Sequence, residues 1–342
     1  MKSKIIKFTN CSCTFYTEAN WDAIDTICNK QTTYIITDAN VFKNHKAKFE
    51  KRNVIVLRAG EMYKQQATVD AIINSLLQMG ADRQSFLLGV GGGVVTDITG
   101  YAASIYMRGI KFGFVPTTVL GMVDASIGGK NGVDVGLYKN IVGCINQPQF
   151  IFYALEFLQT LPLKQWRNGF AEIIKHAAVC DATLFNTLAN HDIHFYKNNI
   201  LPLQTLIAKN ITIKTNIVSA DEFETGIRKL LNLGHTLAHA IENTYNLMHG
   251  EAVAIGITAA AFISEQQGYK NTLNKVAPLL QQYGLPTFAK FNVNKVMDIL
   301  LHDKKKTATG INYILLIKIG DAYIENLNAK TIKKYLDAFI KA

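Results

Sequence analysis

The stretch GVGGGVVTDITG, residues 89–100, decides how the first half of the chain folds. Four of its first five residues are glycine; it follows the apolar run SFLL and leads into a helical pattern. A glycine-rich turn between a strand and a helix lets backbone N–H groups approach a phosphate. The common dinucleotide pattern G-x-G-x-x-G fails here, because its last position falls on Val94 or Thr96, and the P-loop lysine is absent. Taken alone, the run predicts a tight turn that either binds an anion or only packs closely.

The residues around this turn alternate between short apolar runs and helical patterns. Buried strands are expected at residues 34–37, 54–57, 86–90 and 112–118, with helices at 68–80 and from near Asp97. This alternation predicts βαβ units and a mostly parallel sheet. Polar groups follow the strand ends at Asp38, in GEMYK (60–64) and at Thr117–Thr118. Since ligands bind at the carboxyl ends of such strands, the nucleotide interpretation of the glycine run gains weight.

Length and composition limit the class of protein. The 342 residues, 49% of them hydrophobic, predict about two domains. The alternating pattern makes residues 1–165 an α/β Rossmann-like nucleotide domain, and the long helical patterns from about Trp166 make residues 166–342 a mainly α-helical domain, to which the motifs described below assign metal and substrate binding. The longest uncharged apolar run, residues 252–264, is too short to span a bilayer, and the N-terminus lacks a signal peptide, so we expect a cytoplasmic protein without a membrane partner. The net charge of +10 has no dense basic run beyond Lys304–Lys306 and no nucleic-acid motif, and spread-out charge of this kind equally suits an anionic small substrate, so composition alone does not choose between these partners.

Three polar clusters interrupt the helical second half: GFAEIIKH (169–176), NLGHTLAHAIE (232–242) and LMHGEAVAIG (247–256). Helical spacing of four residues places Glu172 with His176, and His235 with His239, on shared faces. Histidine and carboxylate together are the ligands of a catalytic zinc, which needs three protein ligands and an open position. A single histidine is more often a helix cap or a core hydrogen-bonding group. The clusters therefore indicate a metal site but leave open which three residues bind.

Cationic side chains lie near the glycine turns and the metal candidates. They are Lys130, Lys139, Lys175, Lys214 and Arg228. Each alone would be read as a solvated surface residue, but their grouping favours a pocket for phosphate or carboxylate. Near the C-terminus, residues 311–325 predict a β-hairpin with its turn at Gly320–Asp321.

The ordered motifs GGGVVTD, VPTTVLGMVDASIGGK, GFAEIIKH, ADEFETGIRKLLNLGHTLAHAIE and HGEAVAIG resemble those of 3-dehydroquinate synthases, from about Asp38 to about Lys306. The resemblance implies that the glycine run lies under the pyrophosphate of NAD. Thr96 stands where many relatives carry glycine. The NAD contacts implied are Asp38, Glu61, Lys64, Gly91, Gly92, Gly93, Val94, Val95, Thr96, Asp97, Thr117, Thr118, Lys130, Lys139, Phe157, Leu158, Gln159 and Thr160.

The same resemblance resolves the metal question, with zinc, or cobalt in its place, held by Glu172, His235 and His249. His239 becomes an acid/base residue, and His176 stands where many relatives carry tyrosine. The implied substrate is 3-deoxy-D-arabino-heptulosonate 7-phosphate. The catalytic residues implied are Lys130, Lys175, His239, Asn140 and Asp124, and the substrate-binding residues are Arg108, Lys214, Arg228, Asn232, Lys304 and Lys305. Arg108 resembles an arginine that reaches the phosphate site of a neighbouring subunit, so the resemblance also implies a homodimer.

The implied reaction is a phosphate-eliminating lyase step that oxidises and then reduces its substrate, so that NAD is not consumed. It belongs to the shikimate pathway of aromatic amino acid biosynthesis. One alternative is a sugar phosphate cyclase of the valiolone or deoxy-inosose type; Lys214, Arg228 and Asn232 argue against it, because they resemble a carboxylate-binding set. A second is a metal-dependent polyol dehydrogenase, which would accumulate NADH. A third is a non-enzymatic sugar-phosphate or nucleotide sensor, which the intact metal set disfavours.

Overall fold

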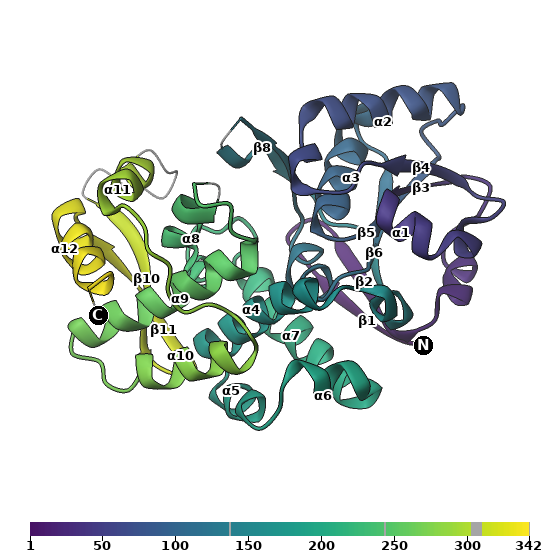
Figure 1. Ribbon diagram of the computed structural model, residues 1–342. Helices are drawn as coiled ribbons and strands as arrows, with labels where there is room; N and C mark the ends of the chain where they lie inside the picture. Colours follow the sequence, from purple (N-terminus) through teal and green to yellow (C-terminus); the bar gives the residue numbers. More distant parts are fainter. Residues whose placement is uncertain (137, 243, 302–309, 342) are drawn as a thin grey trace. The chain divides into compact units, whose positions relative to one another are not determined.

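The computed structural model describes residues 1–136, 138–242, 244–301 and 310–341, so Lys304 and Lys305 lie outside the described residues. The chain forms two compact units (Figure 1). The first comprises Met1–Trp166 and Ile207–Phe223, and the second comprises Arg167–Leu206 and Glu224–Ala342. The segment 207–223, which the sequence analysis assigns to the second domain, thus groups with the first unit. The domain division at residues 165 and 166 stays a prediction.

A seven-stranded sheet forms the centre of the first unit, in the order β1-β2-β9-β6-β5-β3-β4. Only the β1–β2 pair is antiparallel, so the prediction of a mostly parallel sheet is confirmed. The four strands expected from apolar runs are β3, β4, β5 and β6. The strands are β1 (Lys2–Lys7), β2 (Ser12–Ala19), β3 (Thr33–Asp38), β4 (Asn53–Leu57), β5 (Phe86–Gly91), β6 (Lys111–Pro116) and β9 (Phe150–Ala154).

The chain reverses its direction of travel across the sheet between β3 and β5. From β3 it goes outward to β4, and it then returns to the other side of β3 for β5, β6 and β9. Parallel α/β sheets bind ligands outside the carboxyl ends of the strands at such a switch point. Asp38 ends β3 and Gly91 ends β5, so the glycine run begins at this point.

Short helices and a hairpin complete the first unit. The remaining elements are α1 (Ala39–Asn44), α2 (Gln66–Gln78), α3 (Gly93–Ile105), the hairpin β7 (Lys130–Val135) and β8 (Tyr138–Ile145), and the single turns η1 (Trp21–Thr26), η2 (Lys46–Phe49), η3 (Glu61–Tyr63), η4 (Tyr106–Arg108), η5 (Gly121–Ala125) and η6 (Leu155–Thr160). The expected helix 68–80 is α2. Helix α3 begins at Gly93 rather than near Asp97, because the turn ends at the extended N-cap Gly92 and Gly93 is already helical.

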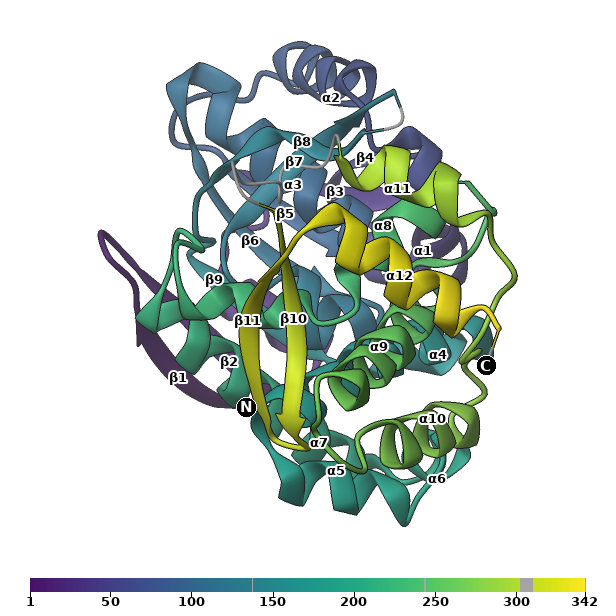
Figure 2. The same ribbon diagram turned by 90° about the vertical axis from the view of Figure 1, so that its left-hand side faces the viewer.

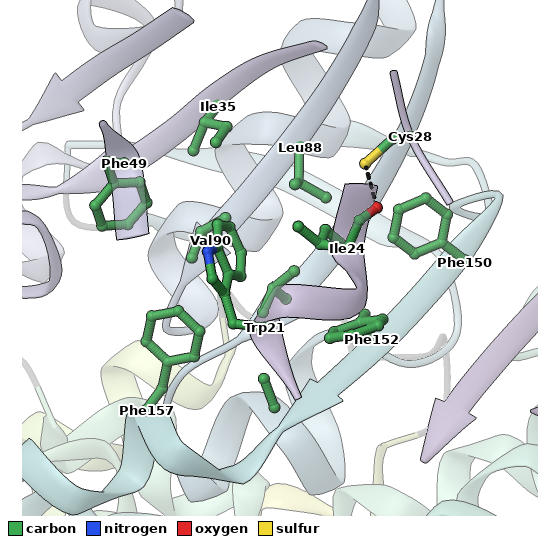
Figure 3. Close-up of a cluster of buried hydrophobic side chains, with 12 residues drawn as sticks. Trp21, Ile24, Cys28, Ile35, Phe49, Leu88, Val90, Phe150, Phe152 and Phe157 are labelled. Atoms are coloured by element: carbon green, nitrogen blue, oxygen red, sulfur yellow. Dashed lines mark hydrogen bonds between the residues drawn. The ribbon is translucent and has the colours of Figure 1, made fainter. Parts of the chain in front are cut away.

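Aromatic side chains from η1, η2 and η6 cover one face of the sheet (Figure 3). Trp21 packs edge-on against Phe49 and Phe157, with ring centroids 5.9 and 5.5 Å apart. Leu88 and Val90 of β5 belong to the same buried cluster. The alternating residue Gly89 faces Thr99 of α3, so α3 covers the opposite face. Both faces of the sheet are therefore covered, and the carboxyl ends of its strands are where a ligand can approach.

The second unit is mainly helical, as expected. Two helices are divided between the units: α4 (Leu163–Cys180), mostly in the second unit, and α7 (Ile200–Ala220), mostly in the first. The other elements of the second unit are α5 (Ala182–Ala189), α6 (Ile193–Asn198), η7 (Ile227–Asn232), α8 (His235–Glu242), α9 (His249–Gln266), α10 (Leu273–Gln282), α11 (Val293–Leu301), β10 (Ile311–Lys318), β11 (Asp321–Leu327) and α12 (Ala329–Phe339). The division between the units passes through α4 and α7. Within the described part of the chain, no helix combines the length and apolarity needed to cross a membrane.

Helix α9 is the centre of the second unit, and it packs against α8, α10, α12 and the hairpin β10–β11 (Figure 2). The hairpin confirms the prediction for residues 311–325, but Lys318 pairs with Asp321, so its turn is Ile319–Gly320. The turn shifts by one residue because Gly320 supplies a positive φ of 85°. Helices α8 and α9 approach so closely that a Cβ on Gly256 would lie 2.0 Å from the carbonyl oxygen of Gly234.

Candidate metal centre and nucleotide cradle

Three side chains of the second unit converge on one point. Glu172 lies in the middle of α4, whereas His235 and His249 are the first residues of α8 and α9. The Nε2 atoms of His235 and His249 lie 3.6 and 3.1 Å from Oε1 of Glu172, and one ligand atom from each residue lies within 4.8 Å of the others. Among the residues left open by the sequence pattern, these three form one such group, and Glu172 also lies within reach of His176.

Both histidines present the same ring nitrogen to Glu172. Nδ1 of His235 lies 3.2 Å from the carbonyl oxygen of Leu233, and Nδ1 of His249 lies 3.4 Å from Oε2 of Glu242. These acceptors favour the tautomer with the proton on Nδ1, which leaves the lone pair on Nε2. Tetrahedral zinc with ligands at 2.0–2.1 Å would separate its ligand atoms by about 3.3 Å. The donor set and its spacing therefore fit zinc.

Burial and charge shape this cluster. Glu172 is fully buried, and the Lys175 ammonium, one helical turn later, contacts its Oε2. Burial, together with Lys175, lowers the pKa of His235 well below its ordinary value. Burial would also lower the pKa of His249, but hydrogen bonds to Glu172 and Glu242 outweigh it and raise that pKa to about 10. A position that favours a proton between two carboxylates also favours a divalent cation.

The other two histidines of the pattern take different positions. His176 is fully buried on α4, one turn beyond Glu172. His239 packs edge-on against His235, with ring centroids 5.5 Å apart, and it is partly exposed. Neither belongs to the group formed by Glu172, His235 and His249. The His239 imidazole beside His235 is therefore reached by solvent.

In the first unit, the glycine run forms a bare cradle at the switch point of the sheet. A Cβ on Gly91 would lie 2.5 Å from Val95, and one on Gly92 would lie 3.0 Å from Thr118. Gly92 is the N-cap of α3 and has no side chain with which to cap the first N–H groups of the helix. These N–H groups and the helix dipole favour an anion. The cradle therefore fits the pyrophosphate of a dinucleotide.

Residues at the neighbouring strand ends have structural roles of their own. The Asp38 carboxylate caps α1 by accepting hydrogen bonds from the N–H groups of Asn40 and Val41, and burial raises its pKa. The N–H of Thr117 donates to the Gly91 carbonyl at 2.9 Å. In η6, the side chains of Phe157 and Leu158 are buried whereas Gln159 and Thr160 are exposed, so a cofactor contact from Phe157 would use its backbone.

Lys64 joins two predicted ligand-binding residues. Its ammonium donates to Oδ2 of Asp97 and to Oδ1 of Asn140, each at 2.5 Å. Asn140 has a left-handed φ of 52°, and its N–H donates to Asp134 at 2.7 Å. Burial raises the pKa of Asp97 to about 6, although Lys64 counteracts the shift. Lys139 lies 3.5 Å from Glu61 in the same region.

The remaining predicted residues fall into both units. In the first, Lys214 donates to Oδ1 and to the backbone carbonyl of Asp124, at 2.6 and 2.5 Å. Lys130 begins β7 and is exposed. In the second, Arg228 and Asn232 lie four residues apart in η7. The structure does not describe Lys304 or Lys305.

Two residues of interest were missed by sequence reasoning. Glu224 accepts a hydrogen bond from the Asn232 amide at 2.7 Å, and Glu242 contacts His249 as described above. For Glu242 a signal exists, because it follows His235 by seven residues and therefore shares its helix face. Glu224 lies in the acidic segment ADEFETG, which offers no comparable signal.

Arg108 lies in a left-handed turn after α3. Met107, Arg108 and Gly109 have φ values of 47°, 68° and 112°. Left-handed backbone is unfavourable for the two residues that carry a Cβ. The turn leaves Arg108 exposed.

Comparison with known proteins assigns the family. The model of the 3-dehydroquinate synthase N-terminal region matches residues 54–168, and that of the C-terminal region matches residues 169–306. The chain belongs to the 3-dehydroquinate synthase family. A curated 3-dehydroquinate synthase from Leptospira interrogans is 38% identical over 300 residues, covering 84% of this chain and 83% of the relative. The resemblance inferred from the ordered motifs is thereby confirmed.

Solved sugar phosphate cyclases share the fold of this 3-dehydroquinate synthase family member. The 2-epi-5-epi-valiolone synthase of Streptomyces hygroscopicus, solved with NAD⁺ and Zn²⁺ bound, has a TM-score of 0.88 at 25% identity over 99% of both chains. A 2-deoxy-scyllo-inosose synthase, complexed with carbaglucose-6-phosphate, NAD⁺ and Co²⁺, has a TM-score of 0.86 at 26% identity over 98% of this chain and 99% of that one. The predicted fold class is confirmed. These two cyclases are 25–26% identical to this chain, whereas the Leptospira 3-dehydroquinate synthase is 38% identical, so the alternative cyclase assignments are not favoured.

Proposed function

We propose that this chain is a 3-dehydroquinate synthase that converts 3-deoxy-D-arabino-heptulosonate 7-phosphate to 3-dehydroquinate and phosphate. The observation that carries the proposal is the Glu172–His235–His249 cluster, whose histidine Nε2 atoms face a buried carboxylate. It occurs in a family member with a bare glycine cradle at the switch point of its sheet. The enzyme is then a phosphate-eliminating lyase of the shikimate pathway and of aromatic amino acid biosynthesis.

Glu172, His235 and His249 would hold zinc, or cobalt in its place. The metal, when bound, lowers the pKa of coordinated substrate hydroxyls and polarises a carbonyl. Lys175 contacts Glu172 and supplies a cation for an anionic group of the substrate. His239, partly exposed beside His235, accepts and returns the proton of a substrate hydroxyl.

The glycine cradle and the N-terminus of α3 would hold the pyrophosphate of NAD, which supplies a hydride acceptor and donor when bound. Asp97 and Lys64 fix the wall of this pocket through their mutual ion pair. Thr117 and Thr118, at the end of β6, offer hydroxyl groups beside Gly91 and Gly92. The contacts predicted for Glu61, Lys139 and η6 complete the cofactor site in this proposal.

The anionic substrate would be bound by amide and cationic groups. Lys130 and Asn140, on the β7–β8 hairpin, together with Asp124, orient its hydroxyl groups. Arg228 and Asn232 on η7 bind its carboxylate end, with Lys214 as a further cation. This carboxylate set distinguishes the proposed substrate from those of valiolone and inosose synthases. Lys304 and Lys305 keep their predicted role on sequence grounds alone.

Arg108 supports a proposal about assembly. A strained turn that exposes an arginine is consistent with a contact to another molecule, and we assign that contact to the substrate phosphate of a partner subunit in a homodimer. We further propose a cytoplasmic location, and two folding domains at 1–165 and 166–342.

The test incubates purified protein with NAD⁺, Zn²⁺ and the heptulosonate phosphate, and it follows phosphate release and NADH together. Phosphate release with a dehydroquinate product and no net NADH is expected. Glu172→Gln should abolish both metal binding and phosphate release. NADH that accumulates without phosphate would instead indicate a polyol dehydrogenase. Phosphate release from sedoheptulose 7-phosphate but not from the heptulosonate would indicate another cyclase.

A further inference from the structure

Glu242 is a buried carboxylate that no part of the proposed reaction uses. It ends α8, is 5% exposed, and places Oε2 3.4 Å from Nδ1 of His249. On the opposite side of the same ring, Nε2 lies 3.1 Å from Glu172. We propose that Glu242 is a positioning residue for the metal ligand His249, whose Nδ1 proton it accepts, and that it strengthens metal binding through this contact. The inference rests on the proposed function, because it requires a metal at Glu172.

Orientation is the first part of the effect. A neutral imidazole carries one proton, and the nitrogen that carries it cannot bind a metal. An acceptor at Nδ1 keeps the proton there and holds the lone pair of Nε2 toward Glu172. Acceptors of this kind in metalloproteins typically contribute 10- to 100-fold to metal affinity.

The two histidines differ in how firmly their orientation is fixed. Nδ1 of His235 faces the backbone carbonyl of Leu233, only two residues earlier in the chain. Nδ1 of His249 faces a side chain from another helix. His235 is thus oriented by its own local backbone, whereas His249 depends on Glu242. This difference makes Glu242 the position at which one substitution tests the contact.

Charge is the second part of the effect. Glu172 contributes one negative charge, but the Lys175 ammonium contacts the same carboxylate. A divalent cation here would leave the buried cluster strongly positive, and buried charge without compensation is costly. Glu242 adds a second negative charge on the far side of the His249 ring. A glutamine at this position would keep the shape and an acceptor but remove that charge.

A nearby carboxylate offers a matched control. Glu251 lies two residues after His249, and its Oε2 accepts a hydrogen bond from the Met248 N–H at 2.9 Å, which caps α9. It therefore stabilises the start of the same helix through the backbone. A substitution of Glu251 perturbs the fold near His249 and leaves the carboxylate at its Nδ1 in place.

The experiment compares the metal-free wild type with Glu242→Gln, Glu242→Ala and Glu251→Gln. Each protein is titrated with Zn²⁺ against a chromophoric chelator, and the thermal midpoint of the metal-free form is measured. We expect the zinc Kd to rise about 10-fold in Glu242→Gln and about 100-fold in Glu242→Ala. Glu251→Gln keeps the acceptor for the Met248 N–H but removes a negative charge from the first turn of α9, so it should lower the thermal midpoint slightly and change the zinc Kd less than about threefold.

A spectroscopic readout separates positioning from a general loss of stability. Co²⁺ bound to Glu242→Gln should show shifted visible d–d bands, whereas Co²⁺ bound to Glu251→Gln should show the wild-type spectrum. Wild-type zinc affinity and cobalt bands in both Glu242 variants would overturn the inference and leave the proposed function intact. A wild type that binds no zinc would refute the metal site itself and, with it, this inference.

Discussion

The close approach of α8 and α9 predicts that Gly256→Ala will impair metal binding from a position that does not touch the metal. The new Cβ would lie 2.0 Å from the carbonyl oxygen of Gly234, whereas real Cβ atoms keep at least 3.0 Å from such neighbours. The backbone must therefore separate by about 1 Å. Gly234 immediately precedes His235, so the displacement reaches a predicted ligand directly.

The magnitude follows from the tolerance of metal sites. Ligand distances in metal sites fall within about 0.2 Å of their ideal values, and the expected backbone shift is about five times larger. We expect at least a 100-fold rise in the zinc Kd, measured by chelator competition. The free energy of unfolding of the metal-free protein should fall by about 1–3 kcal/mol from overpacking, offset by about 1 kcal/mol because alanine favours a helix over glycine.

Gly268→Ala is the control for this prediction. Gly268 has a φ of 97° and open space around its Cβ position, so alanine there is strained without displacing a neighbour. It should cost about 1 kcal/mol of stability while zinc affinity stays unchanged. Wild-type zinc affinity in Gly256→Ala would refute the idea that this helix contact fixes His235.

Three further predictions concern individual side chains. Lys175→Met removes the ammonium that contacts Glu172, so zinc affinity should stay unchanged or rise, while phosphate release falls by about 100-fold. Weaker zinc binding would contradict this assignment. His176→Tyr should still bind zinc, but its free energy of unfolding should fall by about 1–3 kcal/mol, because a larger ring replaces a fully buried imidazole. Loss of metal from a dialysed sample would overturn the choice of ligands. Burial raises the pKa of Asp97 to about 6, so its proton stabilises the fold at low pH and that stability is lost between about pH 4 and pH 6. Asp97→Asn should flatten this part of the curve of unfolding free energy against pH, and identical curves would refute the assignment.

The strands around the glycine run were predictable from the sequence, because each is a short, uninterrupted run of apolar residues. The start of α3 was placed four residues late, since successive glycines resemble a turn although Gly93 is already helical. The grouping of 207–223 with the first unit has no local signal. It depends on contacts with residues far away in the chain, such as the bond from Lys214 to Asp124.

For the metal site, helical spacing indicated candidate pairs but could not select the ligands. Glu172 and His176 share a helix face by spacing and lie within reach of each other in the structure, but Glu172 also meets His235 and His249 from two other helices, which spacing does not predict. That grouping depends on how closely α8 and α9 pack, which periodicity does not encode. The family resemblance supplied the three residues because it compares whole ordered motifs.

The course of the chain between its two units limits how the protein can be recombined. The first unit contains 207–223 as well as 1–166, and the later segment bonds to the earlier one through Lys214 with Asp124 and through Glu222 with Thr9 and Gln147. A chimaera joined at residue 166 would pair one parent's sheet with the other parent's α7. Exchange of halves between relatives therefore requires three crossover points, so that 207–223 travels with the sheet it evolved against.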